Sequence, residues 1–345
     1  MQKLALVMIA RNEQRCITRA RESVRLYVDD MIVLDTGSTD DTVSLARNAG
    51  AKIFHFDWCD DFAKARNTAL SHSDADWNLI LDADEYLVAG GNILKGLKTI
   101  KPDFVGAISI ESDFSSETER QQAQNWLIRL LPASVQFTGR VHEQPAHHFP
   151  VKNLNIHCGH DGYLPIQRDQ KKGRNEYLLL TALSEKPDDP YLHYQLGKEK
   201  EVDGDFIIAL QSYRKSLSLI NTSLESWQRD LVLRSLFCMK KVNDFDTALK
   251  LAKKWQHTLE MIPDYHFVLG DLYLDMALDN PAHADALLPM IEAHWLRCLE
   301  IGEKPDIDGC IKGRGSTLAA HNLSVFYETI GLPDKAAFYK NLSMQ

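Results

Sequence analysis

The N-terminal part of the chain alternates between short apolar runs and segments with helical spacing, and this alternation constrains the fold more than any other feature. The apolar runs have the length of buried strands, and the segments between them place apolar residues three and four positions apart. Strands that alternate with helices predict a mainly parallel sheet with helices on both faces. The predicted strands are 4–10, 31–34, 52–56 and 77–81, and the predicted helices are 17–28, 42–49 and 62–70.

The pattern changes further along the chain. A sequence of 345 residues is long enough for two ordinary domains, each with its own core. Almost continuous helix is predicted from Lys171 onward, after β-rich runs at 105–110, 126–131 and 151–156 that extend the sheet. We therefore expect an α/β domain at 1–170, a linking helix at 171–187 and an all-α domain at 188–345.

A repeated spacing of small and aromatic residues organises the helical part. Leu196-Gly197, followed by Ala209, Tyr213 and Ser216, matches the pattern of a tetratricopeptide repeat of about 34 residues. Small residues at these positions let paired helices approach closely, which favours a short superhelical stack over the alternative, an ordinary helical bundle. The spacing recurs at Ala248, Ala252 and Trp255, at Leu269-Gly270 with Tyr273, and at Leu323, Tyr327 and Ala336, with an insertion at 280–288.

Composition narrows the class of protein. The formal net charge of −9 provides no broad basic surface, so nucleic acid is excluded as the main partner. The six cysteines are scattered without a CxxC pair, which is typical of reduced thiols. No stretch reaches the ~18 consecutive apolar residues of a membrane helix. We expect a cytoplasmic protein, and peripheral binding at the inner membrane face stays open.

Three acidic residues follow the predicted strand at 77–81. Asp82, Asp84 and Glu85 repel one another and lose hydration at a buried strand end unless a cation or a donor-rich ligand lies among them. Carboxylate oxygens suit Mg²⁺ or Mn²⁺, and such an ion can bridge two oxygens of a diphosphate. Open α/β sheets bind ligands beyond the C-terminal ends of their strands. This placement favours a metal site over the alternative, a solvated acidic turn.

The loops after the other strands carry further polar side chains. The first strand leads into ARNE rather than a Gly-rich turn, and the sequence has no Walker A motif, which excludes the usual phosphate-binding loops. Asp35 follows the second strand and could accept hydrogen bonds from a nucleobase or ribose. Arg66 lies on the helix after the third strand, from where it could reach a nucleotide or merely pair with Asp61 or Asp35.

Four motifs in this order resemble those of family 2 glycosyltransferases with the A-type fold. The resemblance covers about the first 175 residues of the chain. The combination of these motifs with the C-terminal repeats is similar to the subgroup that includes the peptide S-glycosyltransferases of glycosylated bacteriocins. The motifs are IARNE at 9–13, DTGSTDDT at 35–42, FAKARN at 62–67 and LDADE at 81–85.

The resemblance implies a UDP-sugar donor and a set of site residues. Asp84 would hold the metal ion, and His160 would be a second ligand, with His157 as the competing choice. The residues implied to line the nucleotide-sugar site are Ala10, Arg11, Asn12, Glu13, Asp35, Ser38, Arg66, Asn67, Asp82, Ala83 and His142.

Glu143 is the candidate catalytic base. Transfer with inversion requires a base on the acceptor side, opposite the departing diphosphate. His142 could orient Glu143 or contact the diphosphate, and Arg129 and Arg140 could stabilise the charge of the leaving group. The alternative is that Arg140 and Glu143 form a surface pair on a loop.

These observations predict an inverting, metal-dependent glycosyltransferase. The acceptor is expected to be a peptide or protein docked on the repeats, or a glycan such as lipopolysaccharide or another cell-surface glycan. A nucleotidyltransferase is a rival, but its Gly- and Lys-rich signature is absent. A repeat scaffold with an inactive transferase domain is a second rival. The sequence does not reveal the sugar, and a homodimer is one of the oligomeric states left open.

Overall fold

The computed structural model divides into two compact units, Met1–Ala182 and Leu183–Gln345. The predicted domain boundary at 170 lies outside the described residues, and helix α6, Arg174–Glu185, falls within the predicted linking helix. The described residues are 1–115, 120–160, 173–220 and 225–344, with the side chains of 112–115 and 120–124 excepted.

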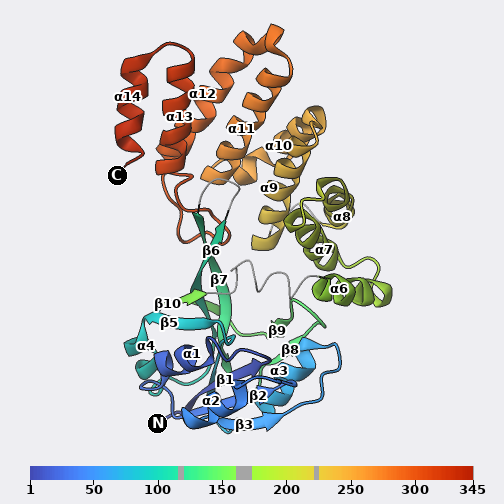
Figure 1. Ribbon diagram of the computed structural model, residues 1–345, viewed down its shortest axis with the longest axis vertical. Coiled ribbons are helices and arrows are strands. Elements are labelled where there is room, and N and C mark those ends of the chain that lie inside the picture. The colour runs from blue at the N-terminus through green and yellow to red at the C-terminus, as the bar shows by residue number, and fades with distance from the viewer. Residues whose placement is uncertain (116–119, 161–172, 221–224, 345) are drawn as a thin grey trace. The chain divides into compact units, whose positions relative to one another are not determined.

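The first unit is built on a sheet that is curled and mainly parallel. Its strands are β1 Leu4–Ala10, β2 Asp30–Asp35, β3 Lys52–His55, β4 Trp77–Ile80, β5 Glu85–Ala89, β6 Val105–Ser115, β7 Arg120–Pro132 and β10 Val151–His160. Within the described residues they form eight strands in the order β3-β2-β1-β4-β7-β6-β10-β5 (Figure 1). β3, β2, β1 and β4 are all parallel, β7 is antiparallel to β4 and β6, and β10 is parallel to β6 but antiparallel to β5. The predicted sheet is thus confirmed.

Helices cover both faces of this sheet because alternate residues of a strand point to opposite faces. In β1, Leu6 joins a core cluster that contains residues of α1 and α4, whereas Val7 joins a second cluster with residues of α3. Both side chains are almost completely buried. The helices of this unit before β6 are α1 Ile17–Val24, α2 Thr42–Asn48, α3 Phe62–Ser71 and α4 Gly91–Leu97.

Several short elements of this unit were not predicted. β5 is half exposed and carries no clear alternation, so its sequence gives little strand signal. It turns into α4 at Gly90, where φ is +95°, and a Cβ at Gly91 would lie 2.2 Å from the ring of Tyr27. Two strands of three residues, β8 Gln136–Thr138 and β9 Gln144–Ala146, pair antiparallel as a separate hairpin.

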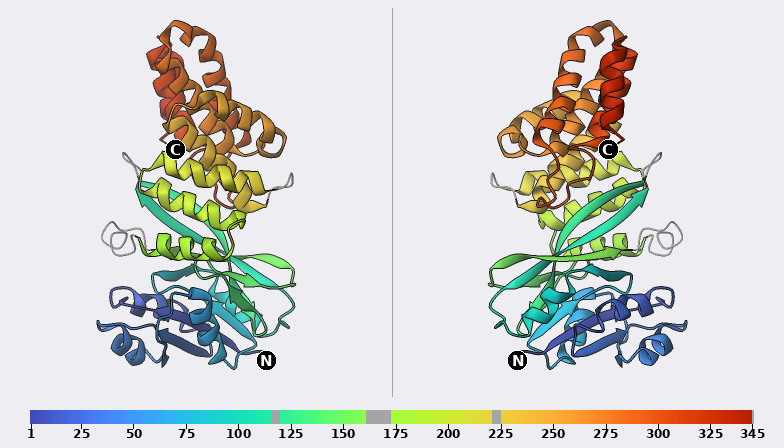
Figure 2. Two further views of the ribbon diagram at one scale, coloured as in Figure 1. Left: turned by 90° about the vertical axis from the view of Figure 1, so that its right-hand side faces the viewer. Right: turned by 90° about the vertical axis from the view of Figure 1, so that its left-hand side faces the viewer.

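The second unit is helical, and its packing confirms the repeat architecture. A Cβ at Gly197 would lie 2.2 Å from the ring of Tyr213, and one at Gly270 would lie 2.4 Å from Trp295, so each glycine lets its helix approach the next (Figure 2). The helices are α7 Pro190–Val202, α8 Phe206–Leu219, α9 Ser226–Lys241, α10 Phe245–Leu259, α11 Pro263–Asp279, η1 Pro281–His283, α12 Ala284–Ile301, α13 Thr317–Thr329 and α14 Pro333–Leu342.

The predicted repeat positions are enclosed by these helices. Leu196 and Tyr273 are half-buried, and the other small and aromatic positions named above are buried. The insertion at 280–288 forms η1 and the first turn of α12, which has 18 residues and is the longest described helix. The insertion therefore lengthens a helix.

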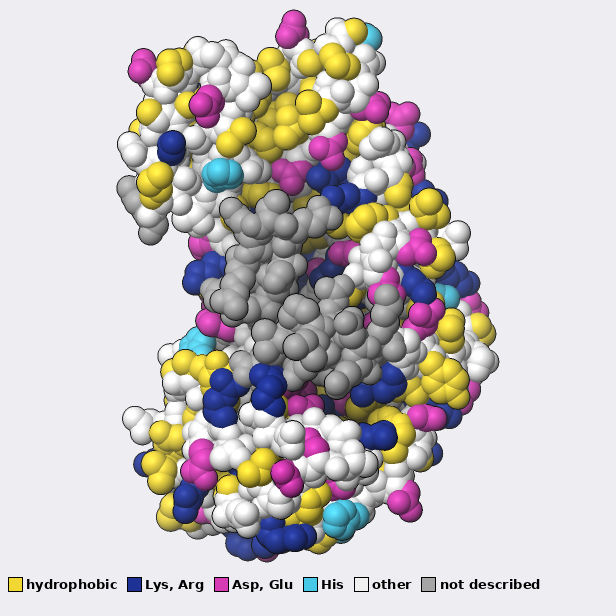
Figure 3. All heavy atoms as spheres, in the orientation of Figure 1, with side chains coloured by type: hydrophobic (Ala, Val, Ile, Leu, Met, Phe, Trp, Pro, Cys, Tyr) yellow, Lys and Arg dark blue, Asp and Glu magenta, His cyan; other side chains and the backbone are white. Residues whose placement is uncertain are grey.

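The surface carries charges of both signs. Acidic and basic side chains are interspersed on the face shown in Figure 3. Among the described residues, no helix combines the length and the apolar character needed to cross a bilayer.

Candidate active site

The C-terminal ends of β2, β1 and β4 bring together three segments that are far apart in sequence. Because these strands are parallel neighbours, their ends lie along one edge of the sheet. The register pairs Ala10 with Asp35, and Asp82 follows β4 on the other side of β1. Three of the four sequence motifs therefore meet at this edge.

Hydrogen bonds hold the loop after β1 against the loop after β2. The backbone N–H of Asn12 donates to Ser38 Oγ at 3.0 Å, and Asn12 Oδ1 accepts from the N–H of Thr39 at 2.8 Å. The buried carboxylate of Asp35 accepts from the N–H groups of Gly37 at 3.3 Å and Ser38 at 3.1 Å. These polar groups are therefore held in place before any ligand binds.

Two further predicted residues and one unexpected histidine lie at the same edge. Arg11 is exposed, and Glu13 is half-buried with its N–H donating to Thr42 Oγ1 at 2.7 Å. At the end of β3, His55 Nδ1 lies 3.4 Å from Asp35 Oδ2. The sequence analysis did not single out His55, although its place at the end of the third parallel strand was a usable signal.

A chain of alternating charges runs through the centre of the site. Arg66 Nη2 lies 2.6 Å from Asp82 Oδ1, and Arg66 Nε pairs with Glu143. Arg129 Nη2 lies 2.7 Å from Asp82 Oδ2 and 2.5 Å from Glu85 Oε1. Arg66, Arg129 and Glu85 are buried, and the side chains of Glu143 and Asp82 are 10% and 33% exposed. The order along this chain is Glu143, Arg66, Asp82, Arg129 and Glu85.

This arrangement corrects two alternatives from the sequence. Arg66 pairs with Asp82 and Glu143 instead of with Asp61 or Asp35, and Asp61 Oδ1 instead accepts from the Lys64 N–H at the start of α3. Glu143 was also considered as one half of a surface pair, but it is largely enclosed and bound to Arg66. Both differences depend on how α3 packs against β1, β2 and β8, which helix periodicity alone does not show.

The two acids beside Arg129 have shifted pKa values in opposite directions. Burial raises the pKa of Asp82, but Arg129 and Arg66 outweigh that effect and hold its pKa well below the usual range. Burial also raises the pKa of Glu85, and the single guanidinium of Arg129 only partly opposes this rise. Asp82 is therefore the firmly ionised member of the pair.

Asp84 and His160 are brought together by strand pairing. β5 and β10 are antiparallel with His160 opposite Glu85, and His160 Nε2 lies 3.4 Å from Asp84 Oδ2. His157, the competing choice, instead lies 2.6 Å from Asn155 Oδ1. Ala83 is buried between the two aspartates of the turn. The geometry thus joins Asp84 to His160.

Asp84 and His160 place a carboxylate oxygen and an imidazole nitrogen side by side, and both are ligand types that a divalent cation such as Mn²⁺ accepts. The other acids of the site, Asp82, Glu85 and Glu143, are already paired with Arg66 or Arg129. No group of three or more His, Cys, Asp or Glu side chains suited to a metal occurs among the described residues. Such an ion would therefore need further ligands from substrate oxygens or water.

Helix α3 holds the hairpin that carries Glu143. The N–H of Phe62 donates to the carbonyl of Arg140 at 2.8 Å. Asn67 Nδ2 donates to the carbonyl of Phe137 at 2.9 Å, and the N–H of Phe137 donates to Asn67 Oδ1 at 2.7 Å. The turn of the hairpin contains His142, which is half-buried and has a φ of +51°. This backbone conformation is uncommon for a residue other than glycine.

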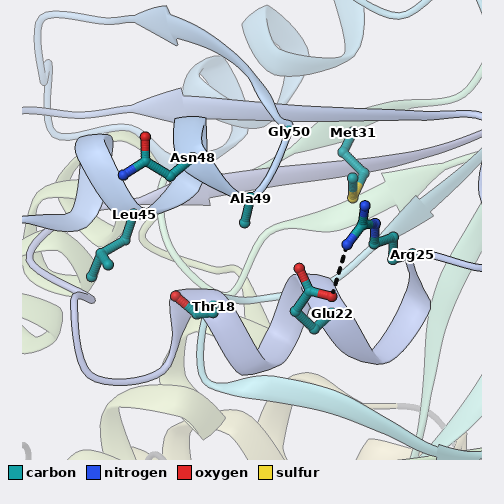
Figure 4. A pocket seen from close by; sticks show the side chains of 8 residues that line it. All are labelled: Thr18, Glu22, Arg25, Met31, Leu45, Asn48, Ala49 and Gly50. Carbon is teal, nitrogen blue, oxygen red and sulfur yellow. Dashed lines mark ion pairs between the residues drawn. The ribbon is translucent and has the colours of Figure 1, made fainter.

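A surface depression lies elsewhere on the first unit, between α1 and α2 (Figure 4). It has a volume of about 490 Å³, and Glu22 and Arg25 form an ion pair of 3.5 Å at its wall. None of its lining residues belongs to the predicted site. These residues are Thr18, Glu22, Arg25, Met31, Leu45, Asn48, Ala49 and Gly50.

The chain is similar to several known proteins. Residues 5–161 match the model of glycosyl transferase family 2. A TPR repeat-containing protein of Synechococcus elongatus is 50% identical over 232 residues, which cover 63% of this chain and 57% of the relative. The SPbeta prophage-derived glycosyltransferase SunS of Bacillus subtilis is 28% identical over 222 residues, which cover 61% of this chain and 52% of the relative.

A solved structure is also similar in part. Glucosyl-3-phosphoglycerate synthase of Mycobacterium tuberculosis, in complex with Mg²⁺ and UDP, is 22% identical over 32% of this chain and 44% of its own, with a TM-score of 0.27. The chain spans about half the length of the curated relatives it matches. Residues 5–161 are thus similar to the family 2 glycosyltransferases, and the edge of the sheet described above lies within them.

Proposed function

We propose that this protein transfers a sugar, with inversion, from a UDP-sugar to a peptide, protein or glycan acceptor. The observation that carries the proposal is the position of Arg66, which joins the carboxylate of Asp82 at the donor edge to the carboxylate of Glu143. A donor site and a base must lie close together for direct transfer. In this proposal the catalytic domain is 1–170 and the repeat domain is 188–345, joined by 171–187.

The donor would bind along the edge formed by β2, β1 and β4. Asp35 would accept hydrogen bonds from the base or ribose, since its carboxylate is already oriented by backbone N–H groups. The loop fixed by Asn12 and Ser38 would border the nucleoside. Asp82 would accept from the ribose or the sugar, and it stays ionised because two guanidinium groups surround it.

Asp84 and His160 are the residues that would hold Mn²⁺ or Mg²⁺. A bound divalent ion supplies positive charge that stabilises the diphosphate as it leaves. Glu85 and Arg129 hold the turn around Asp84 in shape, because Glu85 Oε2 accepts from the Asp82 N–H at 3.0 Å.

Glu143 would take the proton from the acceptor as the new glycosidic bond forms. Arg66 pairs with the carboxylate of Glu143 and would hold it in position for this step. His142, its neighbour, would orient Glu143 or contact the diphosphate. The acceptor would dock on the helical repeats, since stacked repeats present extended surfaces that bind chains.

The experiment that tests the proposal measures nucleotide release from a panel of UDP- and GDP-sugars in the presence of Mn²⁺. We expect release from at least one UDP-sugar and its loss in Asp84→Ala. The matched control is Asp74→Ala, because Asp74 is an exposed aspartate in the same unit that pairs with Lys3 at the surface. Full activity in Asp84→Ala, or no release from any sugar, would contradict the proposal.

A further inference from the structure

The hairpin of β8 and β9 is separate from the main sheet. In the described structure its strands pair with each other, whereas the remaining strands form the eight-stranded sheet. A hairpin of three-residue strands is not stable by itself in water. Its position, and therefore that of Glu143 at its turn, must be set by contacts with the rest of the unit.

Helix α3 supplies these contacts from consecutive residues. Arg66 binds the side chain of Glu143, and Asn67 binds both backbone groups of Phe137 at the other end of the hairpin. The side chains of consecutive helical residues point about 100° apart. Arg66 and Asn67 therefore contact the hairpin at two separate places, Glu143 and Phe137. Phe137 is buried in the core cluster that also contains Ala63 of α3, which restricts its movement.

Both polar atoms of the Asn67 amide bond to the backbone of Phe137. Its oxygen accepts from the N–H of Phe137 at 2.7 Å, and its nitrogen donates to the carbonyl of the same residue at 2.9 Å. The Asn67 amide thus donates to and accepts from one residue of β8, as the backbone of a neighbouring antiparallel strand would. Removing the amide would leave the buried backbone groups of Phe137 without these partners, which is unfavourable.

We infer that Asn67 is a positioning residue that sets the reach of Glu143 toward the acceptor, rather than a contact of the nucleotide. This inference rests on the proposed function, in which Glu143 is the base. The side chain of Asn67 bonds to the backbone of Phe137 and contacts neither Glu143 nor, in the proposed function, the reacting atoms. It acts through the backbone of β8 and through the turn that contains Gly139 and His142.

The first arm of the test does not depend on activity. Hydrogen exchange followed by mass spectrometry is measured on the full chain and on Asn67→Ala. We expect faster exchange in the segment 136–146 and unchanged exchange in 77–82. The control is Thr68→Ala, because Thr68 is the next residue and its hydroxyl bonds only within α3, to Lys64 O at 2.9 Å, among the described contacts. Unchanged exchange of 136–146 in Asn67→Ala would overturn the inference.

The second arm uses UDP release from the UDP-sugar that the wild type turns over fastest. Asn67→Ala should lower kcat by about 10- to 100-fold, because a displacement of about 1 Å costs this much, and should leave KM for the donor unchanged. Asn67→Asp keeps an acceptor for the N–H of Phe137 but loses the donor to its carbonyl. Its kcat should therefore lie between the kcat of the wild type and that of Asn67→Ala. A raised donor KM with normal kcat would instead mark Asn67 as a nucleotide contact.

A double-mutant cycle separates positioning from general damage. If Asn67 acts through Glu143, then Asn67→Ala should cause no further loss in the Glu143→Gln background. Independent, multiplicative losses would refute a role through Glu143. If the wild type releases UDP from no sugar, the proposed function fails and so does the role of Asn67 in it, while the exchange arm still reports on the hairpin.

Discussion

The guanidinium of Arg129 lies 2.5 Å from the carboxylate of Glu85, and both residues are buried, with exposures of 9% and 2%. The same nitrogen also reaches Asp82. Arg129 comes from β7 and the two acids flank the turn after β4, so this contact joins the antiparallel part of the sheet to its parallel part. The turn that presents Asp84 therefore depends on a residue more than forty positions away.

Replacing Arg129 with methionine should be strongly destabilising. The change leaves Glu85 buried without its cation, and breaking a buried pair in this way costs about 3–5 kcal/mol. The free energy of unfolding, measured with urea, should fall by an amount in this range. Lys3→Met is the matched control, because Lys3 pairs with Asp74 at the exposed surface. Equal unfolding curves for the two variants would show that the buried pair contributes nothing.

The space around two helical glycines predicts opposite effects when each is replaced by alanine. A Cβ at Gly270 would meet the buried ring of Trp295 at 2.4 Å, so Gly270→Ala should cost about 1–3 kcal/mol. Gly96 in α4 has open space around it, and Gly96→Ala should stabilise by up to about 1 kcal/mol because alanine favours a helix. Thermal or urea unfolding of each variant checks the signs. A stabilising Gly270→Ala would contradict the packing described here.

Asp271 in the helical unit should make stability depend on pH. Burial raises its pKa to about 6, although Lys240 and Arg314 oppose the shift. An unfolded aspartate titrates near 3.9, so between about pH 4 and 6 the folded state binds more protons. The stabilising contribution of the protonated form is complete below pH 4 and is lost as pH rises through 6.

Asp271→Asn isolates this effect. The amide keeps hydrogen-bonding groups near Trp295 and Asn322, each of which donates to Asp271 Oδ1 at 3.3 Å. The unfolding free energy of Asp271→Asn minus that of the wild type should be larger at pH 7 than at pH 4, by on the order of 2 kcal/mol. Urea unfolding at both pH values gives this difference. A difference that does not change with pH would mean that Asp271 titrates normally.

The sheet and its polar edge were predictable because they follow from local patterns. Apolar runs of strand length fix β1, β2 and β4, and parallel order brings Ala10, Asp35 and Asp82 to one edge. The partners of Arg66 were not predictable in this way. It lies 77 residues before Glu143, and no periodicity shows which acid a buried guanidinium will meet.

The pairing of β5 with β10 was also not predictable from the sequence. β5 is short and half exposed, and its register with β10 depends on pairs of residues that lie 68 to 75 positions apart in the sequence. His160 was named only through the family resemblance. The structure adds the physical reason for preferring it to His157, since antiparallel pairing sets His160 opposite Glu85 and near Asp84.

Glu143→Gln gives the most direct test of the chemistry. Glutamine has nearly the same shape but cannot accept the acceptor proton, and loss of a general base lowers the rate by about 10²- to 10⁴-fold. Binding of UDP with Mn²⁺, measured by calorimetry, should stay unchanged because the donor edge is built from other residues. Glu22→Gln, a partly exposed change on α1, controls for the substitution itself. If Glu143→Gln retained wild-type turnover, the base would have to be sought elsewhere, and Arg66 would then hold Glu143 only as a structural counter-ion that keeps the β8–β9 turn against α3.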